Sequence, residues 1–277
     1  MTSTTLDTVL RRDRQAVFAA LVILTVLAWG YTLWLTRHMA GPTVPAMASM
    51  DMSMDMAGMT MTPEIRPWTV TDFVSSFAMW AVMMAGMMLP SATPTILLHA
   101  RVGRQAELQQ KPFAPTGWFA GGYLLAWSVF SAAATGLQGA LYQAALLTPM
   151  LASANDLIGG GLLIAVGIYQ WSSMKNICLT HCRAPLQFIQ QNDFKRGALP
   201  SLGLGFRHGI FCIGCCGALM LLLFVGGVMN VIWIAGLSIL VLLEKAMSDG
   251  RNVSRVFGLA LIIAGISLIC EHLNLLA

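Results

Sequence analysis

A stripe of potential metal ligands runs through one apolar stretch of the chain, residues 206–220. Residues three or four positions apart lie on the same face of a helix. We therefore expect one helix face to carry the side chains of His208, Cys212, Cys215, Cys216 and Met220. Thiolate, thioether and imidazole groups bind soft or borderline metal ions. A single cysteine would be read as a small packed hydrophobe, but three in register with a histidine and a methionine favour a metal site.

Methionine dominates a second segment, residues 47–61, where seven methionines alternate with small and acidic residues. Proline and glycine bracket this segment, which predicts a loop. Thioether sulfur selects Cu(I), and it does not form the disulfides that cysteine forms outside the cytosol. A disordered linker that is merely rich in methionine is the alternative. We interpret the loop as a capture site for Cu(I) or silver, with Met50, Met52, Met54, Met56, Met59 and Met61 as ligands.

A third set of methionines follows helical spacing in residues 79–88. Pro90 and Pro94 come directly after it, and each removes a backbone donor and should kink the helix. Two interpretations stay open: a ladder of thioethers that passes Cu(I) inward, or flexible side chains that fill gaps between helices. The candidate ligands in this segment are Met83, Met84, Met87 and Met88.

Two further cysteines, Cys178 and Cys182, are four positions apart, so one helical turn can present both. Nearby lysine and arginine side chains would favour the thiolate, which is the form that binds metal. Glu244 is also a candidate ligand, because an ionisable residue near the inner end of an apolar span is costly unless it is paired or functional. It could instead be a structural partner of Arg207 or Lys245. Lys245 itself could simply extend to the membrane edge.

The composition predicts a membrane protein. The chain of 277 residues is 57% hydrophobic and 10% charged, with a mean hydropathy of +0.71, whereas soluble domains carry about 25% charged residues. Apolar stretches of about 20 residues can each span a bilayer. We expect an all-α, polytopic bundle of about seven transmembrane helices, at residues 15–36, 70–99, 117–147, 155–174, 203–228, 231–248 and 254–273.

Basic residues cluster at positions 11–14, 101–111, 175–196 and 245–255, whereas the alternate loops hold only Arg37 and Arg66. With seven spans, all four clusters fall on one side, which the positive-inside rule makes cytoplasmic. The N-terminus is then cytoplasmic and the C-terminus lies outside. The net charge of +4 follows from this bias and needs no nucleic acid partner. The apolar run of the first span is longer than the core of a signal peptide, which favours an uncleaved anchor.

We accordingly divide the chain into an N-terminal anchor (1–37), an extracytoplasmic methionine-rich loop (38–69) and a six-helix membrane domain (70–277). Several motifs of this domain resemble, in the same order, a bacterial family of predicted metal-binding integral membrane proteins, over roughly residues 75–265. The motifs are Met83 to Ser91, Tyr169 to Lys175, Cys178 to Cys182 with Arg183 and Pro185, Gly209 to Met220, Gly227 with Met229 and Asn230, and Glu244 with Lys245. The resemblance implies metal binding in the inner membrane but no particular reaction.

Copper handling is the function that these patterns favour. The ligands change from thioether in the loop to thiolate in the cysteine stripe, and this order favours uptake of copper, as Cu(I), from outside to inside. The alternative is a metal-binding subunit or metallochaperone that delivers copper to a membrane copper enzyme without transporting it. A membrane thiol oxidoreductase is less favoured, because no Cys-x-x-Cys on a thioredoxin-like unit is present. Haem binding through His208 stays open, and no Walker motif indicates an ATP-driven pump.

Overall fold

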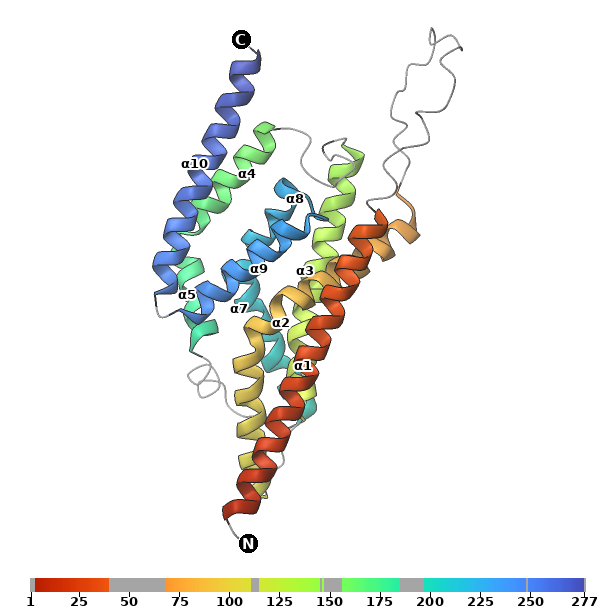
Figure 1. Cartoon of the computed structure of the whole chain (residues 1–277), viewed down its shortest axis with the longest axis vertical. Helices are drawn as coiled ribbons and strands as arrows, with labels where there is room; N and C mark the ends of the chain where they lie inside the picture. Colours follow the sequence, from red (N-terminus) through yellow and green to blue (C-terminus); the bar gives the residue numbers. More distant parts are fainter. Residues whose placement is uncertain are drawn as a thin grey trace.

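The computed structural model describes residues 3–39, 68–110, 115–144, 146, 156–184, 197–247 and 249–276. These residues are almost entirely helical and contain no strand, so the all-α prediction is confirmed (Figure 1). The methionine-rich segment 47–61 lies outside the described residues. The helices are α1 (Ser3–Met39), α2 (Val70–Leu108), α3 (Thr116–Gln143), α4 (Asp156–Tyr169), α5 (Ser173–Arg183), α7 (Ala198–Leu221), α8 (Leu223–Gly226), α9 (Val231–Ala246) and α10 (Gly250–Leu276).

The helices form a bundle whose two termini lie at opposite ends of its long axis (Figure 1). The helix α1 packs along α2, α2 packs on α3, and α3 packs closely on α7. A second pair, α4 and α10, forms the other flank of the bundle, and α5 lies against α7 and α9. The helix α7 is thus held between α3 and α5, which places the middle of its length inside the bundle.

Five of the described helices are long and apolar enough to cross a membrane. The helices α4 and α5 pass the same test only together, because the chain bends by 63° between them. The predicted span at residues 231–248 is the helix α9, which has 16 residues and is shorter than the roughly 20 residues that cross a bilayer core. The structure therefore supports five or up to six spans, and the count of about seven is not confirmed.

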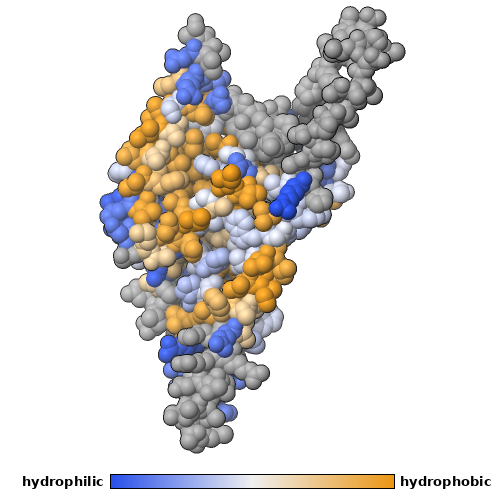
Figure 2. All heavy atoms as spheres, in the orientation of Figure 1, coloured by the Kyte–Doolittle hydropathy of each residue, from blue (hydrophilic) through white to orange (hydrophobic). Residues whose placement is uncertain are grey.

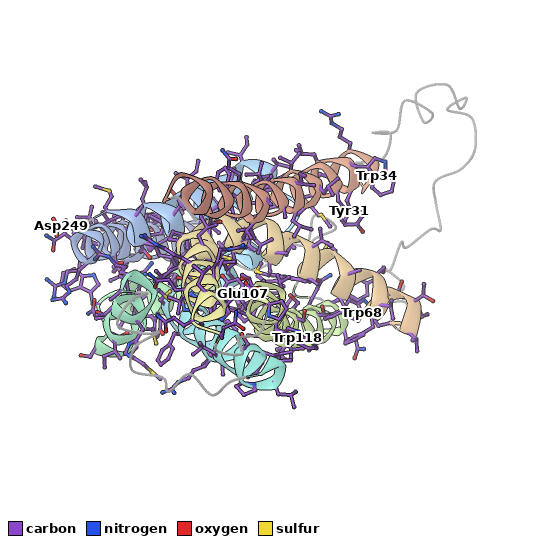
Figure 3. All side chains as sticks on the ribbon, turned by 90° about the horizontal axis from the view of Figure 1, so that it is seen from below. Tyr31, Trp34, Trp68, Glu107, Trp118 and Asp249 are labelled. Carbon is purple, nitrogen blue, oxygen red and sulfur yellow. The ribbon has the colours of Figure 1, made fainter. Side chains whose placement is uncertain are left out.

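The surface of the bundle is suited to contact with lipid. Apolar atoms cover much of α10 and the middle of α1 (Figure 2), and large exposed hydrophobic side chains are frequent on both helices. Tyr31 and Trp34 in the last third of α1 stack with ring centroids 6.1 Å apart, and Trp68, just before α2, lies toward the same side of the molecule (Figure 3). Tyrosine and tryptophan concentrate at membrane–water boundaries. Which boundary faces the cytoplasm stays a prediction.

The helix α2 begins at a capping box and bends in its middle. The Thr69 side chain accepts a hydrogen bond from the backbone N–H of Asp72, and the Asp72 carboxylate accepts one from the backbone N–H of Thr69. Pro90 and Pro94 lie within the helix, and Figure 1 shows its direction change midway along its length. The bend agrees with the kink expected from two missing backbone donors, and it turns the methionine-bearing half of α2 across the bundle.

Two glycines bring α3 and α7 into backbone contact. A Cβ on Gly122 of α3 would lie 1.9 Å from the carbonyl oxygen of Leu202, and one on Gly205 of α7 would lie 1.9 Å from the carbonyl oxygen of Phe119. No residue with a side chain fits at these two positions, and small residues at helix interfaces allow such close approach. This packing brings Tyr123 of α3 beside the cysteines of α7.

Candidate metal centre

Three cysteines of α7 form a compact group of thiols. The sulfur atoms of Cys212, Cys215 and Cys216 all lie within 4.8 Å of one another, and each residue is only 1% exposed. The Cys212 and Cys216 sulfurs are 3.9 Å apart. The spacing i, i+3, i+4 along one helix creates this arrangement. Among the described residues, these three cysteines make up a group of ligand side chains close enough together to hold one metal ion.

Two other helices each add a sulfur to this group. The Sδ atom of Met88 in α2 lies 3.7 Å from Cys216 Sγ, and Met88 is fully buried. The Sγ atom of Cys182 in α5 lies 3.8 Å from Cys215 Sγ. We call the five residues Met88, Cys182, Cys212, Cys215 and Cys216 the sulfur cluster. The contact between Met88 and Cys216 shows that the methionine-bearing helix reaches the cysteine stripe, which the sequence left open.

The spacing of these sulfurs fits a metal ion. Metal–thiolate bonds of about 2.3 Å, the length that zinc makes, place two sulfurs on one ion about 3.8 to 4.0 Å apart. The sulfur–sulfur distances of 3.8 Å between Cys182 and Cys215 and 3.9 Å between Cys212 and Cys216 fall in this range, and the 3.7 Å between Met88 and Cys216 lies just below it. All six cysteines are free, so no disulfide competes for these thiols. Thiolate and thioether together are soft ligands that favour Cu(I) over hard cations such as magnesium or calcium.

A lysine and a tyrosine hydrogen-bond to the same thiol. Lys245 of α9 donates to Cys212 Sγ at 3.0 Å and to Ser91 Oγ at 2.9 Å. The Tyr123 hydroxyl is 3.2 Å from Cys212 Sγ and donates to the backbone carbonyl of Met88, also at 3.2 Å. A positive charge beside a thiol favours its thiolate, which is the metal-binding form. Lys245 therefore turns into the bundle, although lysines near helix ends often extend to the membrane edge.

Glu244 forms a buried ion pair with a lysine of α5. Its carboxylate accepts hydrogen bonds from Lys175 Nζ at 2.8 and 2.9 Å and from Ser254 Oγ at 2.8 Å. Lys175 also donates to Gln170, and all four residues are at most 1% exposed. The two partners suggested by the sequence were Arg207 and Lys245, and the structure gives Lys175 instead. Lys175 is thus engaged with Glu244 rather than with the thiols of α5.

The remaining ligands predicted on α7 are buried beside the cluster. His208 is 2% exposed, and its ring lies 6.0 Å from the Phe119 ring and 5.8 Å from the Tyr123 ring, centroid to centroid. Met220 is fully buried one turn beyond Cys216. In α2, Met83, Met84 and Met87 are each at most 3% exposed. They precede Met88 on α2, so four buried thioethers lie on the helix that reaches the cluster through Met88.

Cys178 lies next to the cluster but on its outer side. It is half-buried, and its sulfur packs against Gly214 of α7, where a Cβ would lie 2.6 Å away.

Sequence reasoning missed three groups that contact the cluster, namely Tyr123, Ser91 and Lys245. Ser91 and Lys245 stood within the motifs that carry the family resemblance, and nothing in the pattern around Tyr123 pointed to the thiols.

One comparison with known proteins finds a match. A family model described as PpoB2, a copper chaperone, matches residues 77–268, which include every residue of the sulfur cluster together with Tyr123 and Lys245. No curated protein and no solved structure matches the chain.

Proposed function

The chain belongs to the PpoB2 copper chaperone family, and from this premise we propose that it binds copper as Cu(I) in the sulfur cluster and hands the ion to another protein. The cluster offers four thiols and one thioether within the bundle. Copper is the cargo of this protein rather than a resident cofactor. The long apolar helices support a location in the bacterial inner membrane.

The contact of Met88 with Cys216, 3.7 Å between sulfurs, is the observation that best supports Cu(I). Zinc sites are built from thiolate, imidazole and carboxylate ligands, whereas a thioether among thiolates is a soft donor set suited to Cu(I). The carboxylate of Glu244 is held by Lys175 and Ser254, so it does not add a hard oxygen ligand. The donor set supports copper over zinc, magnesium and calcium.

An anaerobic titration of the purified full-length protein with Cu(I), in competition with a chromophoric chelator, tests the proposal. We expect stoichiometric uptake by the wild type. In Cys216→Ser we expect an affinity loss of at least about a hundredfold, since loss of a ligand exceeds the 10- to 100-fold effects of removing groups that support a ligand. Cys270→Ser is the matched control, because Cys270 is exposed near the end of α10. A wild type that binds no Cu(I), or binds it equally well as Cys216→Ser, would contradict the proposal.

Uptake of copper through the protein is the second candidate function. The buried methionines at 83, 84, 87 and 88 support it, since they lead along α2 into the cluster, and the methionine-rich loop 47–61 precedes α2 in the sequence. In this proposal, copper captured by the loop passes along the thioethers to the thiols. The family description favours delivery, whereas the four buried methionines of α2 favour uptake.

Copper flux into vesicles that contain the protein separates the two functions. If uptake operates, Met88→Leu should slow the flux about tenfold, because leucine keeps the volume of methionine and removes only the sulfur. Met174→Leu is the control, since Met174 is 69% exposed at the start of α5. Copper binding without flux in wild-type vesicles would leave delivery as the function and would exclude uptake.

A further inference from the structure

The sulfur cluster has a closed interior and a partly open edge. Cys212, Cys215, Cys216 and Met88 are each at most 1% exposed, so an acceptor cannot reach an ion held among them directly. The two cysteines of α5 differ, because both Cys178 and Cys182 are half-buried. A tightly bound Cu(I) ion leaves a protein most readily when new ligands attach before the old ones are lost, so the accessible thiols mark the place of exchange.

The thiols follow one another outward from α7 to α5. Cys182 Sγ lies 3.8 Å from Cys215 Sγ, so an ion held by the buried thiols can be shared with Cys182 without any helix movement. Cys178 lies one turn earlier on the same face of α5. Its sulfur packs against Gly214, the residue just before Cys215, and the absent side chain of that glycine leaves room for it.

The structure holds α5 so that this face stays against α7. The ring of His181, on the same face, stacks on the ring of Phe211 with a centroid distance of 4.4 Å and an interplanar angle of 1°. At the start of α5, Ser172 caps the helix, and Lys175 forms the buried pair with Glu244 at 2.8 Å. Arg183 donates to the backbone carbonyl of Met247 at the other end. The two thiols are thus presented by an anchored helix.

We propose that Cys178 and Cys182 form an exchange port, through which Cu(I) passes between the buried thiols and a thiol-bearing acceptor protein. In the first step, Cys182 forms a copper–sulfur bond while one bond to a buried cysteine breaks, and the proton of Cys182 moves to the released thiolate. Cys178 and then the acceptor thiol repeat this exchange. Copper stays Cu(I) throughout, so no electron donor or acceptor is required. The port rests on the proposed function, because it needs copper in the cluster.

The port predicts that Cys178 affects the rate of transfer more than the affinity. The experiment loads the purified full-length protein with Cu(I), mixes it with excess of a soluble Cys-x-x-Cys peptide, and follows copper in the peptide over time. We expect Cys178→Ser to slow transfer at least about tenfold while the Kd for Cu(I) changes less than about threefold, a separation of rate from affinity. Cys270→Ser should transfer copper at the wild-type rate.

A second variant tests the same position with every sulfur retained. The methyl group of Gly214→Ala would collide with the Cys178 sulfur at 2.6 Å and displace this thiol, because a side-chain end moves more easily than backbone. We expect slower transfer here as well, with copper binding preserved.

Wild-type transfer rates in both variants would overturn the port while leaving copper binding in place. Equal losses of rate and affinity in Cys178→Ser would also overturn it, because Cys178 would then be an ordinary ligand. A wild type that binds no Cu(I) would overturn the proposed function itself.

Discussion

At the residue scale, Lys245 supplies the positive charge that contacts the sulfur cluster, through its hydrogen bond of 3.0 Å to Cys212. Two thiolates around one Cu(I) ion carry a net negative charge, and burying an uncompensated charge is costly. We therefore expect the ammonium group to stabilise the copper-loaded form. Lys245→Met removes the charge but keeps the length of the side chain.

We predict that Lys245→Met weakens Cu(I) binding about tenfold, within the range observed when a group that supports a metal ligand is removed. Lys245→Arg keeps a positive charge at this position, so it should recover most of the affinity. Competition titration of the three proteins gives the comparison. If Lys245→Arg binds as weakly as Lys245→Met, then the shape of lysine matters at this position rather than its charge.

The chemistry of the site could be predicted from single residues, but its contacts could not. The spacing of Cys212, Cys215 and Cys216 was sufficient to predict the triad, because one helix creates it. The contacts of Lys245 with Cys212 and of Lys175 with Glu244 join residues 33 and 69 positions apart. No periodicity reports which side chains of different helices meet. The sequence therefore grouped Lys175 with the basic residues near the thiols of α5, and it left Lys245 either at the membrane edge or paired with Glu244.

At the element scale, the buried pair of Lys175 and Glu244 fixes α5 to α9, and Ser254 extends this contact to α10. Removing one partner of a buried ion pair leaves a buried charge alone and costs about 3–5 kcal/mol. Replacing both partners with apolar residues avoids this cost. The position of α5, which carries Cys178 and Cys182, should therefore be preserved when both partners are present or both are replaced, and weakened when only one is removed.

We predict that Glu244→Leu strongly lowers the midpoint of thermal unfolding in detergent, and that Lys175→Met combined with Glu244→Leu recovers much of the loss. The single variant should also react faster with a thiol reagent at Cys178, because α5 loosens. The unfolding midpoint and the rate of reaction at Cys178 should be measured for both the single and the double variant. A double variant that is less stable than the single one would show that the charges are favourable in themselves.

The close packing of α3 on α7 gives a second prediction at this scale. A Cβ on Gly122 would lie 1.9 Å from the Leu202 carbonyl oxygen, and backbone cannot yield as a side chain can. We expect Gly122→Ala to destabilise the protein by about 1–3 kcal/mol, as overpacking does. Gly121→Ala is a matched control, since nothing lies within 4 Å of a Cβ at Gly121. Equal unfolding midpoints for the two variants would contradict the close contact.

Helix positions were predictable where the apolar run was long, and less so where the chain turns within it. The predicted span 155–174 is divided in the structure, because α4 ends at Tyr169 and Ser172 caps a new helix. The apolar pattern continues across this break, so hydropathy alone could not find it. In α2, the helix continues past Pro90 and Pro94 to Leu108, beyond the predicted limit at residue 99.

At the scale of the whole molecule, the two termini lie at opposite ends of the long axis (Figure 1), and the distribution of basic residues predicts that the C-terminal end faces outward. Asn274 is exposed near the end of α10. We predict that Asn274→Cys, in a Cys270→Ser background, reacts with a membrane-impermeant maleimide in intact cells. The Cys270→Ser protein alone is the control. Reaction only in inverted vesicles would reverse the predicted orientation.

The burial of Cys212, Cys215 and Cys216 at 1% exposure each also determines what cannot reach a bound ion. Cuprous ions in water react with peroxide and dioxygen, and thiolates are oxidised through sulfenic acid when they are accessible. Side chains of α2, α3, α5, α7 and α9 surround the thiols and keep water and dissolved peroxide away from the three buried ones. The interior of the bundle therefore separates bound copper from aqueous peroxide, and the half-buried thiols at the edge bear the greater risk of oxidation.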